Sequence, residues 1–164
     1  MFVSILMPVY NGGAYLKQAI SSVLNQTYHN FEFIIINDGS TDNTGEIIDS
    51  FTDKRILHIK QKNQGVARSL NNGLKLVKGE YIWRHDADDK CLPDQLEKQV
   101  TFLKQHAEFD LVSTQVAFMT NRGKIAWKYR QPNRRKPNRR RYRFPQRAAG
   151  KYFSTGWPLP PCNS

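Results

Sequence analysis

Short apolar runs alternate with helix-like segments along the first hundred residues, and no other feature constrains the fold as strongly. The apolar runs cover residues 2–7, 31–37, 55–60 and 80–84. After each run, apolar residues recur three or four positions apart, which is the spacing of a helix that buries one face. Strands that alternate with such helices are joined by crossover connections. The sequence therefore predicts an α/β fold with a mostly parallel central sheet and helices on both faces.

Polar loops follow these predicted strands. In a mostly parallel sheet the loops after the strands gather at one edge, and ligands bind there. We expect four loops to converge at this edge: 8–13, 37–41, 63–65 and 86–89. Ser40, Thr41 or Asp42 can cap the helix after the second strand, and Pro93 and Asp94 suit the first turn of the fourth helix. Two later strands are predicted at 110–119 and 124–127, as a hairpin around 120–123.

The formal net charge of +11 suggests nucleic acid or an anionic membrane as partner, but the charge is unevenly distributed. Residues 1–129 hold 15 basic and 14 acidic residues, whereas residues 130–164 hold 10 basic and none acidic. The second stretch also contains six of the eight prolines and lacks apolar periodicity, as is typical of disorder. We predict one domain over 1–129 and a basic, Pro-rich, disordered tail over 130–164, and we do not expect nucleic acid as a partner.

Three explanations of the basic tail stay open. The tail can draw the protein to anionic lipid, since each basic residue near such a surface contributes about 1 kcal/mol. Interleaved Arg, Tyr and Phe can bind RNA by charge and stacking. An abrupt change to an Arg- and Pro-rich composition is also what a shifted reading frame produces, and we favour this third explanation.

The two cysteines, Cys91 and Cys162, lack the paired spacing of a disulfide framework or a zinc site. The amino-terminal apolar run is too short for a signal peptide or a membrane span. We therefore expect a cytoplasmic protein, for which peripheral contact with the inner face of the membrane through the basic tail is compatible with the sequence.

Asp86, Asp88 and Asp89 crowd three carboxylates behind the fourth apolar run. In an extended segment Asp86 and Asp88 face the same side, where two such charges about 4 Å apart repel by about 1 kcal/mol in water and more in a dry cleft. A divalent cation reverses this balance, and carboxylate oxygens suit Mg²⁺ or Mn²⁺. Asp89 can equally cap the following helix. A helix-loop-helix calcium site is not supported, because Lys90 and Cys91 stand where an oxygen ligand and a glycine belong.

Several segments together resemble the amino-terminal half of the family 2 glycosyltransferases: "VSILMPVYNGGAYLKQAISSVLNQTYHNFEFIIINDGSTDNT", "NQGVARSLNNGLKLVKGEYIWRHDADD" and "LPDQLEKQV". The resemblance runs from about Val3 to Val100. It implies the Rossmann-like GT-A fold and a nucleotide-diphospho-sugar donor, with UDP as the expected nucleotide. For a complete enzyme it implies inverting transfer to a saccharide or lipid-linked acceptor in cell-surface polysaccharide synthesis.

The resemblance also implies roles for individual residues. Asp86 and Asp88, with Ala87 between them, would hold Mn²⁺ or Mg²⁺ against the donor diphosphate. Asp38 would accept a hydrogen bond from a pyrimidine ring nitrogen, and Arg68 would lie near the nucleotide. The remaining expected donor contacts are the loop of Pro8, Val9, Tyr10 and Asn11, and the helix entry at Gly65. His85 should face away from Asp86, so we predict a packed histidine rather than a ligand.

One part of the family pattern is missing. Inverting transfer needs a general base near the acceptor hydroxyl, and family members supply an Asp or Glu well downstream of the metal motif. This sequence has no Asp or Glu after Asp110. We therefore assign no catalytic residue and expect the acceptor half to be absent and turnover to be weak. A non-catalytic nucleotide-binding module is the main alternative, and a nucleotidyltransferase and an RNA-binding protein are the others.

Overall fold

A computed structural model describes residues 1–114, 117–119, 125–128 and 151–154. The helices are α1 (Leu16–Leu24), α2 (Thr44–Asp49), α3 (Val66–Leu74) and α4 (Gln95–Gln105). The strands are β1 (Val3–Val9), β2 (Phe31–Asn37), β3 (Ile56–Lys60), β4 (Tyr81–Arg84), β5 (Leu111–Ser113), β6 (Ala117–Met119), β7 (Ile125–Lys128) and β8 (Lys151–Ser154).

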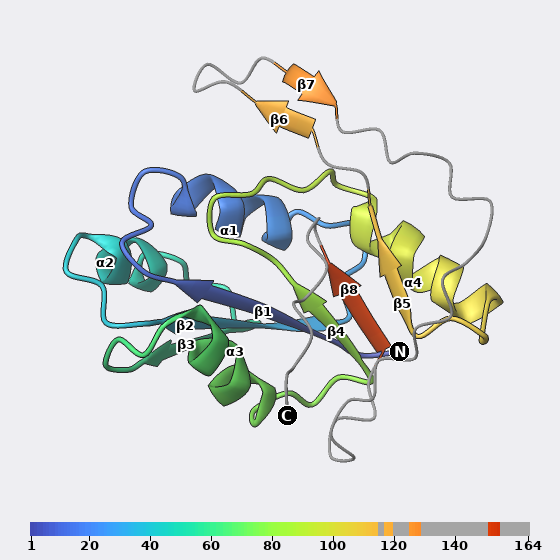
Figure 1. Ribbon diagram of the computed structural model, residues 1–164, viewed down its shortest axis with the longest axis horizontal. Helices are drawn as coiled ribbons and strands as arrows, with labels where there is room; N and C mark the ends of the chain where they lie inside the picture. The colour runs from blue at the N-terminus through green and yellow to red at the C-terminus, as the bar shows by residue number, and fades with distance from the viewer. Residues whose placement is uncertain (115–116, 120–124, 129–150, 155–164) are drawn as a thin grey trace.

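Six strands form one central sheet in the order β3-β2-β1-β4-β8-β5, and every neighbouring pair is parallel. The chain runs outward from β1 through β2 to β3, and then returns to place β4 on the other side of β1. Strands β6 and β7 form a separate antiparallel pair (Figure 1). The predicted mixed α/β fold with a parallel sheet is confirmed.

Helices cover both faces of the sheet, because each helix buries one apolar face against it (Figure 1). Helix α3 packs on one face, where Leu70 and Leu74 lie against a small core of four strand residues: Leu6, Ile34, Ile36 and Ile82. Helices α1, α2 and α4 pack on the other face around a larger core that includes Trp83. Gly73 of α3 lies so close to the sheet that a Cβ atom there would sit 2.9 Å from Ile36 Cδ1.

The first four strands begin and end within two residues of the predicted apolar runs. The later part of the chain differs. The segment 110–119 was predicted as one strand, but it holds two: β5 joins the central sheet and β6 pairs with β7. The predicted hairpin is confirmed in the β6–β7 pair, while its connecting residues 120–123 lie outside the described residues.

Strand β8 falls inside the stretch that the sequence predicts to be a disordered tail. Its four residues instead form a central strand, between β4 and β5. The prediction of disorder is therefore wrong for Lys151–Ser154, because a strand can be specified by its neighbours in a sheet as well as by its own apolar pattern. The rest of the predicted tail lies outside the described residues.

Within the described part of the chain, no helix combines the length and the apolar character needed to cross a membrane.

Candidate functional site

The candidate site lies where the strand order reverses, between β1 and β4. In open parallel sheets, the crevice at such a reversal, beyond the carboxyl ends of the strands, is where ligands bind. The loops after β1, β2 and β4 meet at this edge. Two adjoining cavities open there, and they share four residues: Pro8, Val9, Tyr10 and Val66.

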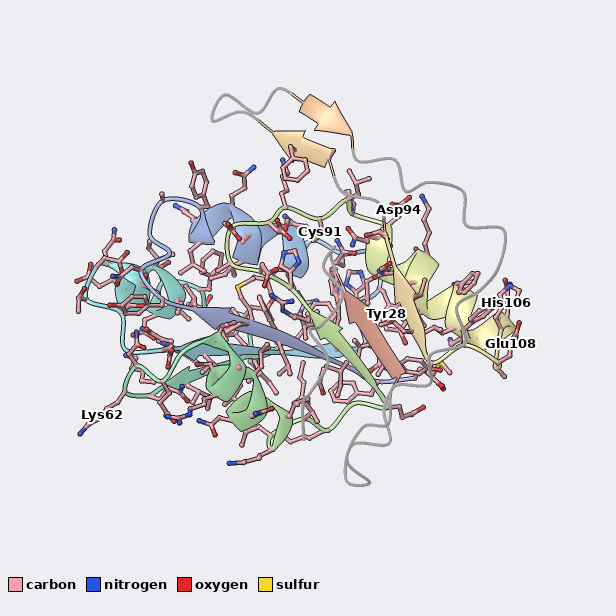
Figure 2. All side chains as sticks on the ribbon, viewed as in Figure 1. Tyr28, Lys62, Cys91, Asp94, His106 and Glu108 are labelled. Carbon is pink, nitrogen blue, oxygen red and sulfur yellow. The ribbon has the colours of Figure 1, made fainter. Side chains whose placement is uncertain are left out.

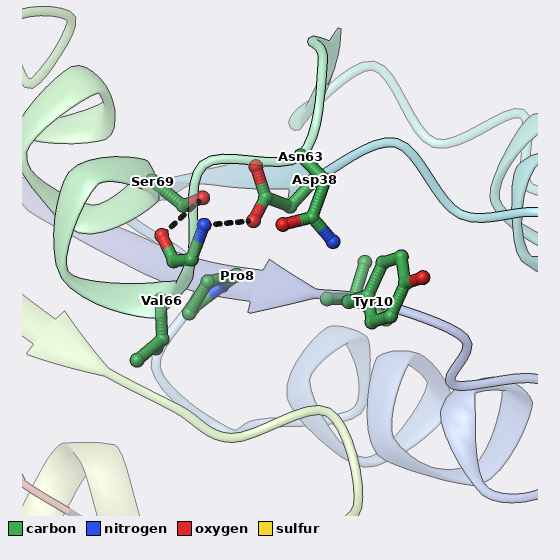
Figure 3. A pocket seen from close by; sticks show the side chains of 8 residues that line it. Pro8, Tyr10, Asp38, Asn63, Val66 and Ser69 are labelled. Atoms are coloured by element: carbon green, nitrogen blue, oxygen red, sulfur yellow. Dashed lines mark hydrogen bonds between the residues drawn. The ribbon is translucent and has the colours of Figure 1, made fainter.

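The first cavity has a volume of about 310 Å³, and Asp38 is one of the residues that line it (Figure 3). Its remaining walls are Asn63, Gly65 and Ser69, in addition to the four shared residues. Asp38 directly follows β2, and its backbone N–H donates to the Val9 carbonyl at 2.8 Å. This bond fixes the start of the loop after β2 against the end of β1.

Asp38 is 3% exposed, and the protein satisfies most of its carboxylate. Oδ1 accepts hydrogen bonds from Gln61 Nε2 at 2.7 Å and from Gln64 N at 3.0 Å, and Oδ2 accepts one from Gly65 N at 2.8 Å. Burial acts to raise the pKa of Asp38, but hydrogen bonds outweigh it, so the pKa lies below its usual value. The donors are Gln61, Gln64, Ser69 and Gly65. Asp38 is thus a fixed carboxylate at the start of α3.

Two glycines make this arrangement possible. Gly39 has a φ of 75°, and a Cβ atom there would lie 2.7 Å from the backbone nitrogen of Asn63. Gly65 has φ 85° and ψ 159°, a conformation that is essentially restricted to glycine. Gly39 thus lets the loop after β2 lie close to the loop before α3, and Gly65 lets the latter turn its N–H groups onto Asp38. A side chain at either position would strain this contact.

The loop after β1 is held by the loop after β2. Asn11 adopts a φ of 50°, the only positive φ of a non-glycine residue among the described residues. Its N–H donates to Ser40 Oγ at 3.0 Å, and its Oδ1 accepts from Thr41 N at 2.9 Å. Gly12 N donates to Thr44 Oγ1 at 2.9 Å. These bonds keep the loop that lines both cavities in one conformation.

The second cavity has a volume of about 410 Å³ and lies on the β4 side. Besides the shared residues, it is lined by Asn11, Gly12, Ala14, Tyr15, Asp86, Ala87 and Asp88. Its walls combine small side chains, the two aromatic rings of Tyr10 and Tyr15, and two carboxylates.

Asp86 and Asp88 reach this cavity in a way that differs from the predicted extended segment. Asp89 N donates to Asp86 O at 3.2 Å, so residues 86–89 form a turn. Arg84 Nη2 donates to Asp86 Oδ1 at 2.7 Å, with 23% of the Arg84 and 28% of the Asp86 side chain exposed. Asp88 is exposed. The turn, rather than an extended strand, brings the two carboxylates to one cavity.

These carboxylates fit an open magnesium- or manganese-type site. Such sites use one or two protein carboxylates and leave the other positions to water and substrate phosphate. Among the described residues, no cationic side chain bonds to Asp86 Oδ2 or to either Asp88 carboxylate oxygen. No group of three or more His, Cys, Asp or Glu side chains could hold a metal within the part of the chain that is described. A cation here would therefore need ligands from a bound diphosphate.

Nine of the ten predicted donor-site residues line one or both cavities: Pro8, Val9, Tyr10, Asn11, Asp38, Gly65, Asp86, Ala87 and Asp88. Arg68 lies on the exposed side of α3 and lines neither cavity. Asp89 lies outside both cavities. His85 is fully buried, as predicted, and burial lowers its pKa to about 4, while the backbone of Asp89 acts in the opposite direction.

Sequence reasoning missed two residues of the site: Arg84, which pairs with Asp86, and Ser69, which lines the first cavity. The loop 63–65 was expected at this edge, and its Asn63 lines the first cavity. Tyr15 lines the second cavity. Ser69 stands four positions after Gly65, so one helical turn places both at the same end of α3. The position of Ser69 could have been found from this spacing, and the Arg84 contact from the two-residue spacing to Asp86, since such residues face the same side of an extended segment.

Comparison with known proteins gives this geometry a family. The family model described as glycosyl transferase family 2 matches residues 4–157. The chain belongs to glycosyltransferase family 2. It is similar to an uncharacterized glycosyltransferase of Haemophilus influenzae, with 44% identity over 135 residues that cover 75% of this chain and 54% of the relative. It also resembles the glycosyltransferase GlyG of Streptococcus pneumoniae, with 43% identity over 58% of this chain and 33% of that protein.

Solved structures agree with this family assignment. The crystal structure of Staphylococcus aureus TarS 1–349 in complex with UDP-GlcNAc matches 71% of the family 2 chain and 35% of the TarS chain, with 26% identity and a TM-score of 0.66. A mannosyltransferase of Pyrobaculum calidifontis, at 24% identity and a TM-score of 0.57 over 62% of this chain and 32% of that one, shows the fold alone. The predicted GT-A fold is thereby confirmed. The chain spans between a third and about half of the length of the curated relatives named above.

Proposed function

We propose that this chain binds a nucleotide-diphospho-sugar, with UDP as the nucleotide, across the two adjoining cavities. The observation that carries the proposal is that the cavities share one wall but differ in chemistry. The first offers a buried carboxylate and polar side chains, and the second offers two carboxylates at a turn. A nucleoside diphosphate has the same division, with a hydrogen-bonding base at one end and a phosphate group at the other.

In this proposal Asp38 holds the base. Within the described part of the chain, its Oδ2 accepts one N–H, from Gly65, and so retains capacity for a further donor such as the ring N–H of uracil. Pro8, Val9 and Tyr10 line both cavities and Asn11 lines the second, so this loop would contact the base and the ribose. The complex of TarS with UDP-GlcNAc supports a uridine donor, because that protein matches most of this chain.

Asp86 and Asp88 would hold Mn²⁺ or Mg²⁺ in the second cavity. A bound cation of this kind supplies charge stabilisation for a leaving diphosphate. The chain's own contribution is to place two carboxylates side by side and to keep Asp86 paired with Arg84, which balances one of the two negative charges.

The reaction we propose for a complete enzyme is inverting transfer of the sugar to a saccharide or lipid-linked acceptor of the cell surface. We also propose a cytoplasmic location, and the buried free thiol of Cys91 is compatible with a reducing compartment. Peripheral membrane contact through the basic residues 130–164 belongs to the same proposal.

Calorimetry with UDP in the presence and absence of Mn²⁺ tests the donor site. Loss of a group that merely supports a metal ligand costs about 10- to 100-fold in affinity, so Asp88→Ala, which removes a ligand, should cost at least about 100-fold in Mn²⁺-dependent UDP affinity. Asp89→Ala is the matched control, since it removes a neighbouring carboxylate outside both cavities. Equal affinities for Asp88→Ala and the wild type would rule out the assigned cation site.

A second candidate function is a nucleotide-binding module without chemistry, because the contacts assigned to the two cavities account for donor binding and do not by themselves include a transfer step. In that case UDP would bind with the same dependence on Asp38 and Asp88, but neither hydrolysis nor transfer of UDP-GlcNAc would be detected.

A further inference from the structure

A buried polar cluster lies behind the turn that carries Asp86 and Asp88. It consists of Ser22 and Gln26 on or just after α1 and of Cys91, and we call it the Ser22–Gln26–Cys91 cluster. The exposed fractions of the three residues are 9%, 0% and 4%. Cys91 lies between α1 and the start of α4 (Figure 2). None of the three lines either cavity, so the proposed donor contacts do not account for them.

Gln26 contacts the 91–96 segment with both ends of its amide. Nε2 donates to the Leu92 carbonyl at 2.6 Å and lies 3.3 Å from Cys91 Sγ, and Oε1 accepts from Leu96 N at 2.8 Å. Ser22 Oγ lies 3.1 Å from Cys91 Sγ and accepts from Cys91 N at 3.2 Å. A fully buried amide with both ends bonded is a specific connection, because any shift of the segment would leave polar groups unpaired.

A second pair of bonds reinforces this attachment at the next residue. Thr27 N donates to the Pro93 carbonyl at 2.8 Å, and Thr27 Oγ1 donates to Glu97 Oε2 at 2.6 Å. The chain is therefore fixed to α1 from Cys91 onward. On the other side, His85 N donates to Leu6 O at 3.0 Å and extends the hydrogen bonding of the sheet by one residue.

Only residues 86–90 lie between these two anchors. They include both carboxylates of the second cavity, and Ala87 at the tip of the turn packs against the larger core. A five-residue segment with both ends fixed has few conformations. The position of its second anchor, at Cys91, therefore determines where the side chains of residues 86–90 point. The Ser22–Gln26–Cys91 cluster provides that far anchor.

We propose that Ser22 and Gln26 are positioning residues that hold the turn so that Asp86 and Asp88 face one cation. This inference rests on the proposed donor site, and it assigns to α1 a role in the cation-dependent part of donor binding. The base end of the donor would not depend on the cluster, because Asp38 is fixed by its own bonds to Gln61, Gln64 and Gly65.

The test measures UDP affinity of the full chain by calorimetry with and without Mn²⁺. For Gln26→Ala we expect the Mn²⁺-dependent gain in UDP affinity to fall by about tenfold or more, as for other groups that orient metal ligands. The affinity for UDP without metal should stay within about twofold of the wild type, since the Asp38 cavity is untouched. Ser22→Ala should act in the same direction with a smaller effect, and it carries the test if Gln26→Ala does not fold.

Ser4→Ala is the matched control for lost buried hydrogen bonds. Ser4 is fully buried at the opposite end of β1, where its Oγ donates to Glu32 Oε1 at 2.6 Å and accepts from Gly79 N at 2.8 Å. This variant should unfold at a lower urea concentration but keep the full Mn²⁺-dependent gain.

The outcomes separate the inference from the proposed function. A wild-type chain with no Mn²⁺-dependent gain would overturn both. A wild-type gain that Asp88→Ala abolishes, but that Gln26→Ala and Ser22→Ala leave intact, would overturn only the positioning role. If Gln26→Ala and Ser22→Ala lose as much UDP affinity without Mn²⁺ as with it, the positioning role is also overturned, because such a loss means general damage to the fold.

Discussion

Asp38 and the Asp86–Asp88 pair both follow parallel strands and open into adjoining cavities, yet their surroundings are opposite. Asp38 is 3% exposed and accepts three N–H donors from its own chain. Asp88 is exposed, and Asp86 forms a partly exposed ion pair with Arg84. We call the Asp38 end of the cleft the completed end, because the protein hydrogen-bonds most of this carboxylate. We call the other end the open end, because among the described residues no cationic side chain pairs with Asp88 or with Asp86 Oδ2.

This difference follows the chemistry of the two ends of the proposed ligand. A base is recognised by one or two directional hydrogen bonds, so the carboxylate that receives them must already be fixed. A cation brings its own strong field and completes its shell with water and phosphate, so its ligands need only be held close together. Stability measurements can therefore tell the two ends apart.

The largest effect is expected at the completed end. Asp38→Ala removes the charged acceptor of three part-buried hydrogen bonds, from Gln61, Gln64 and Gly65, and should lower the free energy of unfolding by roughly 3–4 kcal/mol. Urea unfolding at pH 7 measures this value. Because the folded pKa of Asp38 is lowered, its stabilisation is present above the ordinary aspartate pKa and is lost as pH falls toward the folded pKa. A loss below about 1 kcal/mol would show that the carboxylate is not held as described.

The next effect concerns His85, which is buried directly before Asp86. The pH dependence of stability tests whether its imidazole is neutral in the fold. Its pKa is about 4 in the fold and about 6.5 when unfolded, so the unfolded chain takes up the proton first as pH falls. The free energy of unfolding should therefore drop by about 3 kcal/mol between pH 6.5 and pH 4 from this residue alone. His85→Leu should remove that part of the pH dependence, and His29→Gln on an exposed loop should retain it. The same slope in His85→Leu as in the wild type would contradict a buried neutral imidazole.

Two glycine variants sharpen the description of the completed end. Gly39→Ala combines a positive φ with a Cβ atom 2.7 Å from a backbone nitrogen, so we expect a loss of about 2–3 kcal/mol. At Gly65 no atom lies within 4 Å of the added Cβ atom, so Gly65→Ala should cost only the backbone strain, about 1–2 kcal/mol. Thermal unfolding of both variants gives the comparison, and a reversed order would mean that steric contact is not what makes position 39 critical.

The smallest effect is expected at the open end. Asp88→Ala without metal should change the free energy of unfolding by no more than about 0.5 kcal/mol, because an exposed carboxylate is well solvated. With UDP and Mn²⁺ present, the wild type should gain thermal stability from binding and the variant should lose that gain. A destabilisation of the ligand-free variant comparable to that of Asp38→Ala would remove the distinction between the two ends.

The apolar pattern was sufficient to predict the first four strands, since each run is short, apolar and bounded by polar residues. The convergence of Asp38 and Asp86 at one edge also followed from parallel strands. The apolar pattern did not predict the orientation of Arg68, which was expected near the nucleotide but lines neither cavity. On α3, Ser69 and Gly73 face the sheet and are buried, so Arg68 points outward. The face of α3 that packs inward is set by the close approach of Gly73 to the sheet. This is a tertiary contact, and residue spacing alone does not predict it.

Strand β8 could not be predicted from its own sequence. The segment 151–154 lies in a basic, Pro-rich stretch with no apolar periodicity, and its strand character comes from its two neighbours, β4 and β5. The Arg84–Asp86 pair was within reach of the sequence, because residues two positions apart face the same side of an extended segment. The turn at 86–89 was not, since the sequence suggested that the extended segment continues through Asp88.

The place of β8 has a consequence for how the chain folds. Among the described strands, β5 has no partner in the central sheet except β8, and β8 also joins it to β4. The first four strands can pair as soon as they leave the ribosome, but β5 must wait until more of the chain has been synthesised. Its backbone stays unpaired during that interval, and non-local pairings of this kind are slow and expose the intermediate to aggregation.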